Sequence, residues 1–259
     1  MMRLIGLISV VVTGSLLLYA VSDFPAWGDP NSRPSTYLSP HYITKSLEET
    51  AVPNIVTAVL ADYRGFDTMF ETTVIFAAGV AVLAILRRKR RRKRDDEAEP
   101  HFEGETVDIP EKKPDLIIAN ACRMLVPVIQ LFALYVIAHG HSSPGGGFQG
   151  GVILGASMIL VSLAHNLKAS LRRLSEKTTF ILANIGVLIY AGIGFLCVLL
   201  GANFLGYSAL HKVLPATDEI MARYHGMLGV EIGVGIAVMT IMFIIYMNLS
   251  SSGDLEEGI

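Results

Sequence analysis

Cysteine is nearly absent from this sequence. Its 259 residues include two cysteines, Cys122 and Cys197, and each lies alone inside an apolar stretch. Two isolated cysteines with no Cys-x-x-Cys pair exclude a disulfide framework, and they provide no ligand set for an iron–sulfur cluster. We therefore expect both side chains to behave as small buried apolar groups.

The usual residues of a soluble enzyme are also missing. We find no nucleophile–base pair, and the glycine-rich stretch 139–151 lacks the Gly-Lys-Ser/Thr ending of a phosphate-binding loop. His139 and His141 form a His-Gly-His pair, but a zinc site needs more ligands than these two. We therefore expect a chain that is not an enzyme and that holds neither a cofactor nor a metal.

Charged residues are scarce, and the apolar residues are gathered into blocks. Hydrophobic residues make up 52% of the sequence and charged residues 17%. Polar stretches separate the blocks, a pattern typical of membrane spans rather than of one large soluble core. We predict an all-α, polytopic membrane protein with about six transmembrane helices, each long enough to cross about 30 Å of hydrocarbon. The predicted spans are 4–22, 70–86, 116–138, 148–167, 178–202 and 226–248.

The first apolar block has two interpretations. It follows Arg3 and fits a signal peptide as well as a retained helix. Residues 21–24 (Val-Ser-Asp-Phe) form a poor small-residue cleavage site, which favours a retained first helix.

Basic residues are concentrated where they set the orientation of the chain. An unbroken run of Arg and Lys, 87–94, follows the second span, and the link between the fourth and fifth spans is also basic. Both regions and Arg3 fall on one side if every span crosses, and the positive-inside rule makes that side the cytoplasm. Both termini are then cytoplasmic. The basic run also fits a nucleic-acid patch, but its place against a membrane exit favours a topology anchor that contacts anionic lipids, with no nucleic acid as partner.

Composition divides the chain into two modules. Residues 1–94 hold two spans and a long external segment, and residues 115–259 hold four spans with short links. Residues 95–114 are rich in Asp, Glu, Lys and Pro without apolar periodicity, as in a solvated linker.

The external segment of the first module is patterned rather than random. Gly28-Asp29-Pro30 predicts a turn, Ser39-Pro40 opens a short predicted helix up to residue 47, and 54–63 is expected to be an amphipathic piece at the membrane interface. The stretch that follows holds Asp62, Asp67 and Glu71 around Arg64. If it is helical, Arg64, Asp67 and Glu71 share one face. Two interpretations stay open: a salt bridge at the helix entry, or an acidic mouth that collects cations.

Ionisable residues inside predicted spans are candidates for function because they are costly there. Arg123 lies ~10 Å from the cytoplasmic end of its span at 1.5 Å per residue, on a stripe with Asn120, Pro127 and Gln130. Snorkelling to the headgroups is its alternative role. Glu231 lies ~8 Å from the external end of the last span, as a structural hydrogen-bonding group or a proton relay, with His225 at the outer mouth. Arg123 and Glu231 enter from opposite faces, so we expect each to find a partner elsewhere, on another subunit.

The entry to the fourth span is the most specific feature of the sequence. It reads His-Gly-His-Ser-Ser-Pro-Gly-Gly-Gly-Phe-Gln-Gly-Gly over 139–151 and suits a tight connector between helices. Gly147, Gly151 and Gly155 recur every four residues, which permits close helix contact, and Gly229 and Gly233 offer a second such face.

This stretch carries a family resemblance. Residues 139–166 (HGHSSPGGGFQGGVILGASMILVSLAHN) closely resemble the signature of the MnhB/MrpB subunit of multisubunit cation/proton antiporters. The first module resembles the MbhE-type domain through Gly28-Asp29-Pro30, residues 53–68 and Glu71. That domain usually forms the C-terminal end of the large A-type protein of the antiporter, or a separate small protein in membrane-bound hydrogenases. The loop residues of the signature are His139, His141, Pro144, Gly145, Gly146, Gly147, Phe148, Gly150 and Gly151.

The resemblance implies a subunit that exchanges Na+ for H+ across a bacterial or archaeal cytoplasmic membrane. It implies as partners the large A- and D-type antiporter-like subunits and the small C-, E-, F- and G-type subunits, and it implicates the MbhE-type region in the cation path. The alternative is a structural membrane-arm subunit of a hydrogenase- or dehydrogenase-type complex, whose redox chemistry belongs to its partners. The candidate ion-path residues are then Asp62, Asp67, Glu71, Glu231, Arg123 and His225.

Overall fold

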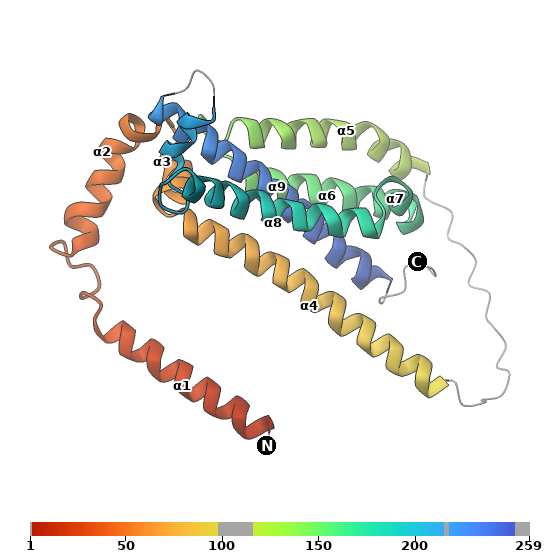
Figure 1. Ribbon diagram of the computed structural model, residues 1–259. Helices are drawn as coiled ribbons and strands as arrows, with labels where there is room; N and C mark the ends of the chain where they lie inside the picture. Colours follow the sequence, from red (N-terminus) through yellow and green to blue (C-terminus); the bar gives the residue numbers. More distant parts are fainter. Residues whose placement is uncertain (1, 98–115, 215–217, 252–259) are drawn as a thin grey trace. The chain divides into compact units, whose positions relative to one another are not determined.

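The computed structural model describes residues 2–97, 116–214 and 218–251, and these form helices and turns with no strand among them (Figure 1). Six of the helices are long and apolar enough to cross a membrane, which confirms the predicted all-α, multi-pass architecture. The predicted linker lies outside the described residues from position 98 onward, as do the side chains of the basic run 87–94 and all of 252–259. The six candidate spans are Leu4–Ser22, Gly65–Leu86, Leu116–Ala138, Gly147–His165, Glu176–Leu199 and Glu219–Ser250.

Two spans begin earlier than their apolar cores predict. The second begins at Gly65 rather than at position 70, and the last at Glu219 rather than at position 226. In the last helix, the carboxylate of Asp218 accepts a hydrogen bond of 2.7 Å from the backbone N–H of Met221, which caps the first turn. Polar residues therefore continue the helix outward, so His225 lies within its second turn rather than at a loop mouth.

The described chain forms two compact units, Met1–Lys45 and Ser46–Ile259. The first holds α1 (Met2–Ser22), a π-helical turn η1 (Pro34–Leu38) and the start of α2 (Ser39–Thr50). The predicted turn is present: Gly28 has a φ of 78°, and the Asp29 carboxylate accepts from the backbone N–H of Asn31. The predicted short helix is also present and continues to Thr50. The unit boundary precedes Ser46, so the division of the chain at 95–114 stays a prediction.

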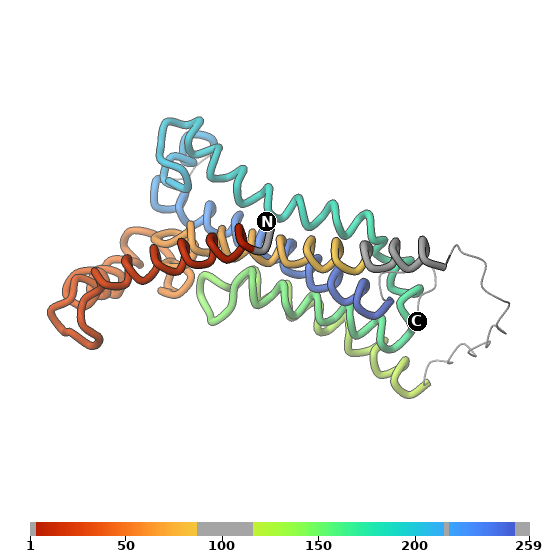
Figure 2. Tube along the Cα trace, turned by 90° about the horizontal axis from the view of Figure 1, so that it is seen from below, coloured from red at the N-terminus to blue at the C-terminus, as the bar shows by residue number. Residues whose placement is uncertain are grey.

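The second unit is a helical bundle built around its last helix. The long helices are α4 (Gly65–Glu97), α5 (Leu116–Ala138), α6 (Gly147–His165), α8 (Glu176–Leu199) and α9 (Glu219–Ser250). The central helix, α9, contacts all four others, and it runs between α8 on one side and α5 with α6 on the other (Figure 2). Its apolar side chains are part of both larger clusters of buried residues.

Glycines let α6 and α9 approach closely. A Cβ added at Gly151 would lie 2.7 Å from the carbonyl oxygen of Gly235, and one at Gly155 would lie 3.2 Å from that of Met239. On the other side of α9, a Cβ at Gly186 of α8 would lie 2.7 Å from the carbonyl oxygen of Gly233. The predicted close packing through small residues is confirmed for α6 and for Gly233.

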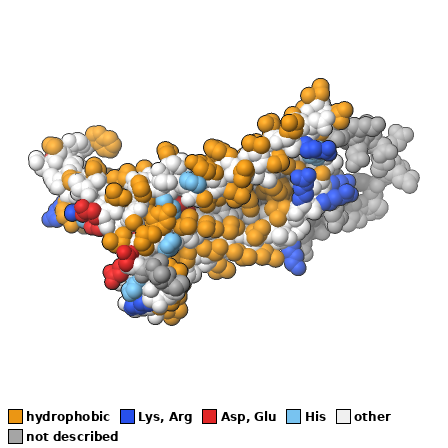
Figure 3. Space-filling model, turned by 90° about the horizontal axis from the view of Figure 1, so that it is seen from above, with side chains coloured by type: hydrophobic (Ala, Val, Ile, Leu, Met, Phe, Trp, Pro, Cys, Tyr) orange, Lys and Arg blue, Asp and Glu red, His pale blue; other side chains and the backbone are white. Residues whose placement is uncertain are grey.

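The two ends of the bundle differ in chemistry. One end, which we call the basic end, carries α7 (Leu167–Arg173), and Figure 3 shows basic side chains gathered there beyond apolar flanks. The opposite end, which we call the loop end, holds the connection 139–146, the 3₁₀ turn η3 (Tyr207–Lys212), α3 (Ile55–Ala58) and the π-turn η2 (Val59–Tyr63). Ionisable and glycine-rich segments thus meet at the loop end.

Candidate functional site: a cavity with two carboxylates

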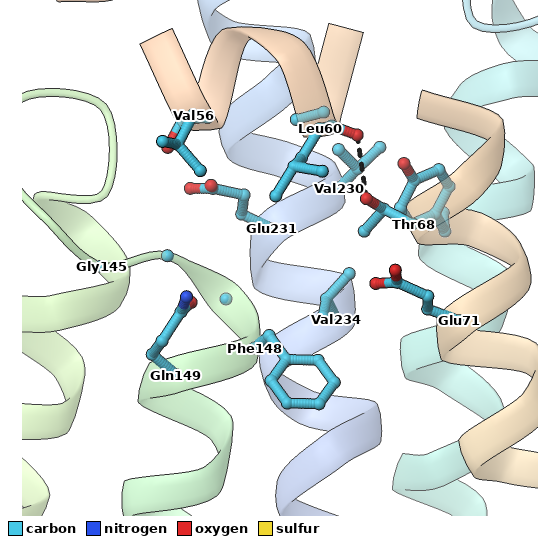
Figure 4. A pocket seen from close by; sticks show the side chains of 15 residues that line it. Val56, Leu60, Thr68, Glu71, Gly145, Phe148, Gln149, Val230, Glu231 and Val234 are labelled. Atoms are coloured by element: carbon cyan, nitrogen blue, oxygen red, sulfur yellow. Dashed lines mark hydrogen bonds between the residues drawn. The ribbon is translucent and has the colours of Figure 1, made fainter. Parts of the chain in front are cut away.

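A cavity of about 230 Å³ lies at the loop end of the bundle. Figure 4 shows the carboxyl groups of Glu71, from α4, and Glu231, from α9, on either side of Val234. The structure therefore brings together two of the predicted ion-path residues, one from each of the two predicted modules. The lining residues are Val56, Thr57, Leu60, Ala61, Thr68, Glu71, Gly145, Gly146, Gly147, Phe148, Gln149, Tyr190, Val230, Glu231 and Val234.

Glu231 is enclosed but poorly partnered. The residue is 8% exposed, and its Oε2 atom makes no hydrogen bond within the described residues. The nearest ionisable group is His141, whose Nδ1 atom is 3.7 Å from Oε2. A buried carboxyl group without hydrogen bonds is costly, so it marks a place where a proton, water or a cation is expected. From the sequence we expect a partner for Glu231 on another subunit, whereas the nearest ionisable group belongs to this chain.

The glycine-rich loop forms the wall next to Glu231. A Cβ at Gly147 would lie 1.9 Å from the backbone carbonyl oxygen of Glu231, and one at Gly146 would lie 3.0 Å from its Oε1 atom. Gly146 also has a φ of 136°, a conformation that favours glycine. The glycines of the signature are therefore needed because the backbone of this loop touches Glu231 directly.

His141 is the other buried polar group at this wall. Its side chain is 1% exposed, and its ring packs on Tyr224 with the centroids 4.3 Å apart. Neither ring nitrogen makes a hydrogen bond within the described part of the chain. Burial lowers the pKa of His141, because the charged form is poorly solvated there. The imidazole is therefore neutral at pH 7 when nothing else changes.

Residues 54–57 hold the glycine-rich loop in place. The Asn54 side-chain amide donates to the carbonyl oxygens of Gly140 and Ser143, at 2.8 and 2.9 Å, and its oxygen caps α3 by accepting from Val56. The Thr57 hydroxyl donates to Gly140 as well, at 2.7 Å. The segment 54–63 packs on the bundle and lines the cavity, with Thr57, Ala58 and Ala61 buried. Its place at the membrane interface stays a prediction.

Two tyrosines satisfy the backbone where η2 gives way to α4. The Tyr207 hydroxyl donates to the carbonyl oxygen of Ala61 at 3.0 Å, and the Tyr190 hydroxyl donates to that of Gly65 at 2.7 Å. Carbonyl groups at a helix break need such partners when they are buried. Burial raises the pKa of Tyr207, so its hydroxyl keeps the proton that it donates.

Two of the predicted acids are paired within the chain. The guanidinium of Arg223, on α9, donates two hydrogen bonds of 2.8 and 2.6 Å to the carboxylate of Asp62. It also lies 5.6 Å from the centre of the Tyr63 ring. Asp67 pairs with Arg64 at the surface, as one of the two interpretations of the sequence had it. Glu71 makes no hydrogen bond or ion pair within the described residues. Of the three acids near Arg64, Glu71 is thus the one available to a ligand.

Three other candidates lie apart from the cavity. Arg123 is exposed on α5 in the isolated chain, His225 is exposed on α9, and the His139 ring is exposed and stacks on Tyr135. On the stripe of Arg123, Gln130 turns inward and donates to Ser157 at 3.2 Å. Within the described residues, no three His, Cys, Asp or Glu side chains converge as metal ligands.

Five residues that build this site had no role predicted from the sequence, although two of them, Asn54 and Thr57, lie in the stretch 53–68 that carries the resemblance: Asn54, Thr57, Tyr190, Tyr207 and Arg223. Tyr190 could have been identified from the sequence, because it carries a hydroxyl group inside an apolar span. The others act through backbone carbonyls or through a partner distant in sequence, which no local pattern shows.

The comparisons with known proteins match two regions of the chain. Residues 117–244 match the family described as a domain related to the MnhB subunit of Na+/H+ antiporter, and residues 5–101 match MbhE, the E component of MBH. The B component of the Na+/H+ antiporter of Bacillus subtilis is 35% identical over 105 residues, which cover 40% of this chain and 73% of that relative. The chain belongs to the MnhB-related family. This confirms the resemblance noted in the sequence.

Other relatives of this MnhB-related chain extend the match. The A/B component of a probable K+/H+ antiporter of Rhizobium meliloti is 26% identical over 72% of this chain and only 19% of that relative. A chain of the Mrp complex from Dietzia sp. is 25% identical with a TM-score of 0.61, covering 94% of this chain and 25% of that one. A chain of an archaeal membrane-bound sulfane sulfur reductase shares the fold at 22% identity, with a TM-score of 0.57, covering 93% of this chain and 97% of that one.

Proposed function

We propose that this chain is a membrane subunit of a multisubunit monovalent cation (Na+)/proton antiporter, where it forms part of the ion path and helps assembly. The observation that carries the proposal is the cavity shared by Glu71 and Glu231. Each carboxyl group comes from a different family-matched region of the chain. The relatives named as antiporter subunits support the same conclusion.

The chemistry of the cavity suits exchange. Hard cations prefer oxygen ligands, and the lining offers the carboxylates of Glu71 and Glu231 together with the oxygens of Thr68, Gln149 and Tyr190. A carboxyl group that holds a proton is neutral and attracts a cation weakly, whereas a carboxylate attracts it strongly in a low-dielectric site. A cation and a proton therefore compete for the same groups, which is the requirement for coupling them.

The basic residues support an orientation in the cytoplasmic membrane. The basic end of the bundle and the run 87–94 are placed in the cytoplasm with both termini, and the cavity then lies toward the outside. The partners are the large A- and D-type and the small C-, E-, F- and G-type antiporter subunits. The alternative, a structural component of a redox complex, is not favoured, because the likeness to the sulfane sulfur reductase chain extends to the fold alone.

The test separates transport from assembly. Glu71→Gln and Glu231→Gln, made singly in the complete complex, remove the charge and keep the size of each side chain. We expect each to lower Na+-driven proton movement in everted membrane vesicles by about 100-fold, with normal amounts of assembled complex. Glu219→Gln, an exposed acid in the first turn of the same helix α9, is the matched control. Normal transport in both cavity variants would refute the proposal, and loss of the complex along with transport would favour the structural alternative.

A further inference from the structure

Two unsatisfied polar groups face each other at the wall of the cavity. The Oε2 atom of Glu231 and the Nδ1 atom of His141 are 3.7 Å apart, and neither makes a hydrogen bond within the described residues. The distance is slightly too long for a hydrogen bond and lies within the range of an ion pair. A proton can pass between two buried groups that each lack a hydrogen-bond partner and lie this close.

The surroundings leave His141 as the nearest basic group to Glu231. The cavity lining contains no Lys, Arg or His. Arg223 of α9 is committed to Asp62, so it is not available to Glu231. The other titratable groups near the pair are Tyr224 and His225 on α9, Tyr190 on α8 and Glu71 on α4. In the part of the lining that α6 and the α3–η2 segment provide, the polar side chains are Gln149 and Thr57, and neither titrates.

We propose that His141 takes the proton that Glu231 loses when a cation enters the cavity, and so acts as the proton-exchange partner of this carboxyl group. The inference deepens the proposed function and rests on it. In the step, the O–H bond of the Glu231 carboxylic acid breaks and an N–H bond forms at Nδ1 of His141. The products are a carboxylate, which holds the cation, and an imidazolium, so no proton is gained or lost by the pair.

The same geometry explains why the proton then leaves. A cation in the cavity and an imidazolium at His141 repel each other, with the carboxylate of Glu231 between them. The burial that favours the neutral form of His141 also disfavours a lasting charge on the ring. The Nε2 atom, which has no hydrogen bond within the described residues, then gives its own proton to a water molecule, the acceptor that this step requires, while Nδ1 keeps the proton taken from Glu231. Cation entry thus expels a proton through His141.

A purely structural role for His141 makes different predictions. In that role the ring fills the space beside Tyr224, with the centroids 4.3 Å apart, and any aromatic ring of that size suffices. His141→Phe keeps this stacking and removes the proton acceptor. His141→Gln keeps a polar side chain that cannot accept a proton at neutral pH. His211→Gln is the control, because that ring on η3 bonds its own turn through Ser208, away from the cavity lining.

The variants are tested in the whole complex in membrane vesicles. We expect His141→Phe and His141→Gln to lower the maximal rate of Na+-driven proton movement by about 100-fold, with little change in the KM for Na+. We also expect the pH dependence of the rate to be lost in both variants and kept in His211→Gln. Transport by His141→Phe at the normal rate and with the normal pH profile would overturn the inference.

Infrared difference spectroscopy on Na+ addition is made on the unaltered complex, so it tests the inference even if a variant fails to assemble. In time-resolved measurements, the unaltered complex should lose a protonated carboxyl band on the addition and gain an imidazolium band that decays as the proton is released. Glu231→Gln should abolish both bands. Absence of the imidazolium band in the unaltered complex would overturn the role of His141, even where Glu231→Gln abolishes transport and the proposed function stands. If Glu71→Gln and Glu231→Gln both transport normally, the proposed function fails instead.

Discussion

The first and last helices of the chain are equally apolar, yet they are used differently. The most apolar windows of α1 and α9 have the same mean hydropathy, but 0% of the α1 window and 61% of the α9 window is buried within the chain. Their glycines differ in the same way. A Cβ at Gly6 or Gly14 of α1 would meet nothing within 4 Å, whereas one at Gly226 or Gly233 of α9 would meet a neighbour at less than 3 Å.

The difference teaches that hydropathy reports insertion into a membrane and not packing within it. In a bilayer, lipid is as apolar as a neighbouring helix, so helices associate through close approach and polar contacts. α9 has both, since its glycines meet α6 and α8 and its Glu231 and Arg223 meet His141 and Asp62. The glycines of α1 have no such neighbour within 4 Å.

The largest effect is expected from filling the contact between α6 and α9. Gly147→Ala places a Cβ only 1.9 Å from the backbone carbonyl oxygen of Glu231. The Cβ is fixed by its own backbone and the oxygen belongs to a helix backbone, so neither atom moves easily. We expect a loss of at least about 3 kcal/mol of stability and little assembled complex, measured by recovery after detergent extraction. Gly14→Ala in α1 is the matched control and should assemble normally. A normal yield of Gly147→Ala would show that α9 is no better packed than α1.

A smaller effect is expected from the ion pair between η2 and α9. Asp62→Ala leaves Arg223, whose side chain is 22% exposed, without its partner, and should destabilise the bundle by roughly 3 kcal/mol. Arg64→Ala breaks the exposed pair with Asp67 and should cost less than about 1 kcal/mol. Thermal unfolding of the solubilised complex measures both changes. Equal changes in the two variants would mean that the contacts of α9 at the loop end are not special.

These contacts also show how far the sequence leads. The apolar blocks were sufficient for six spans, because membrane insertion depends on local composition. Glu71 and Glu231 were identifiable as costly acids, but nothing local indicates that the segment 54–63 folds over the bundle and joins them in one cavity. Asp62 and Arg223 are 161 residues apart, so their pairing depends on the tertiary fold. The sequence alone does not distinguish an acid that is paired within the chain from one that is not.

The smallest expected effect concerns acid, and it again contrasts α9 with α1. His141 is buried against Tyr224 of α9, and burial lowers its pKa, so the folded chain keeps it neutral at a pH where the unfolded chain binds a proton. Stability should therefore be fully present above a pH of about 6.5, the ordinary value for histidine, and fall as the pH drops below it, by at most about 1.4 kcal/mol per pH unit. His141→Phe cannot take up that proton in either state, so its unfolding temperature should depend less on pH between 7 and 5, at roughly the range where histidine titrates. An identical pH dependence in the two proteins would mean that His141 is solvated in the folded complex. The contact of His141 with α9 would then exclude water no better than the surface of α1 does within its own unit.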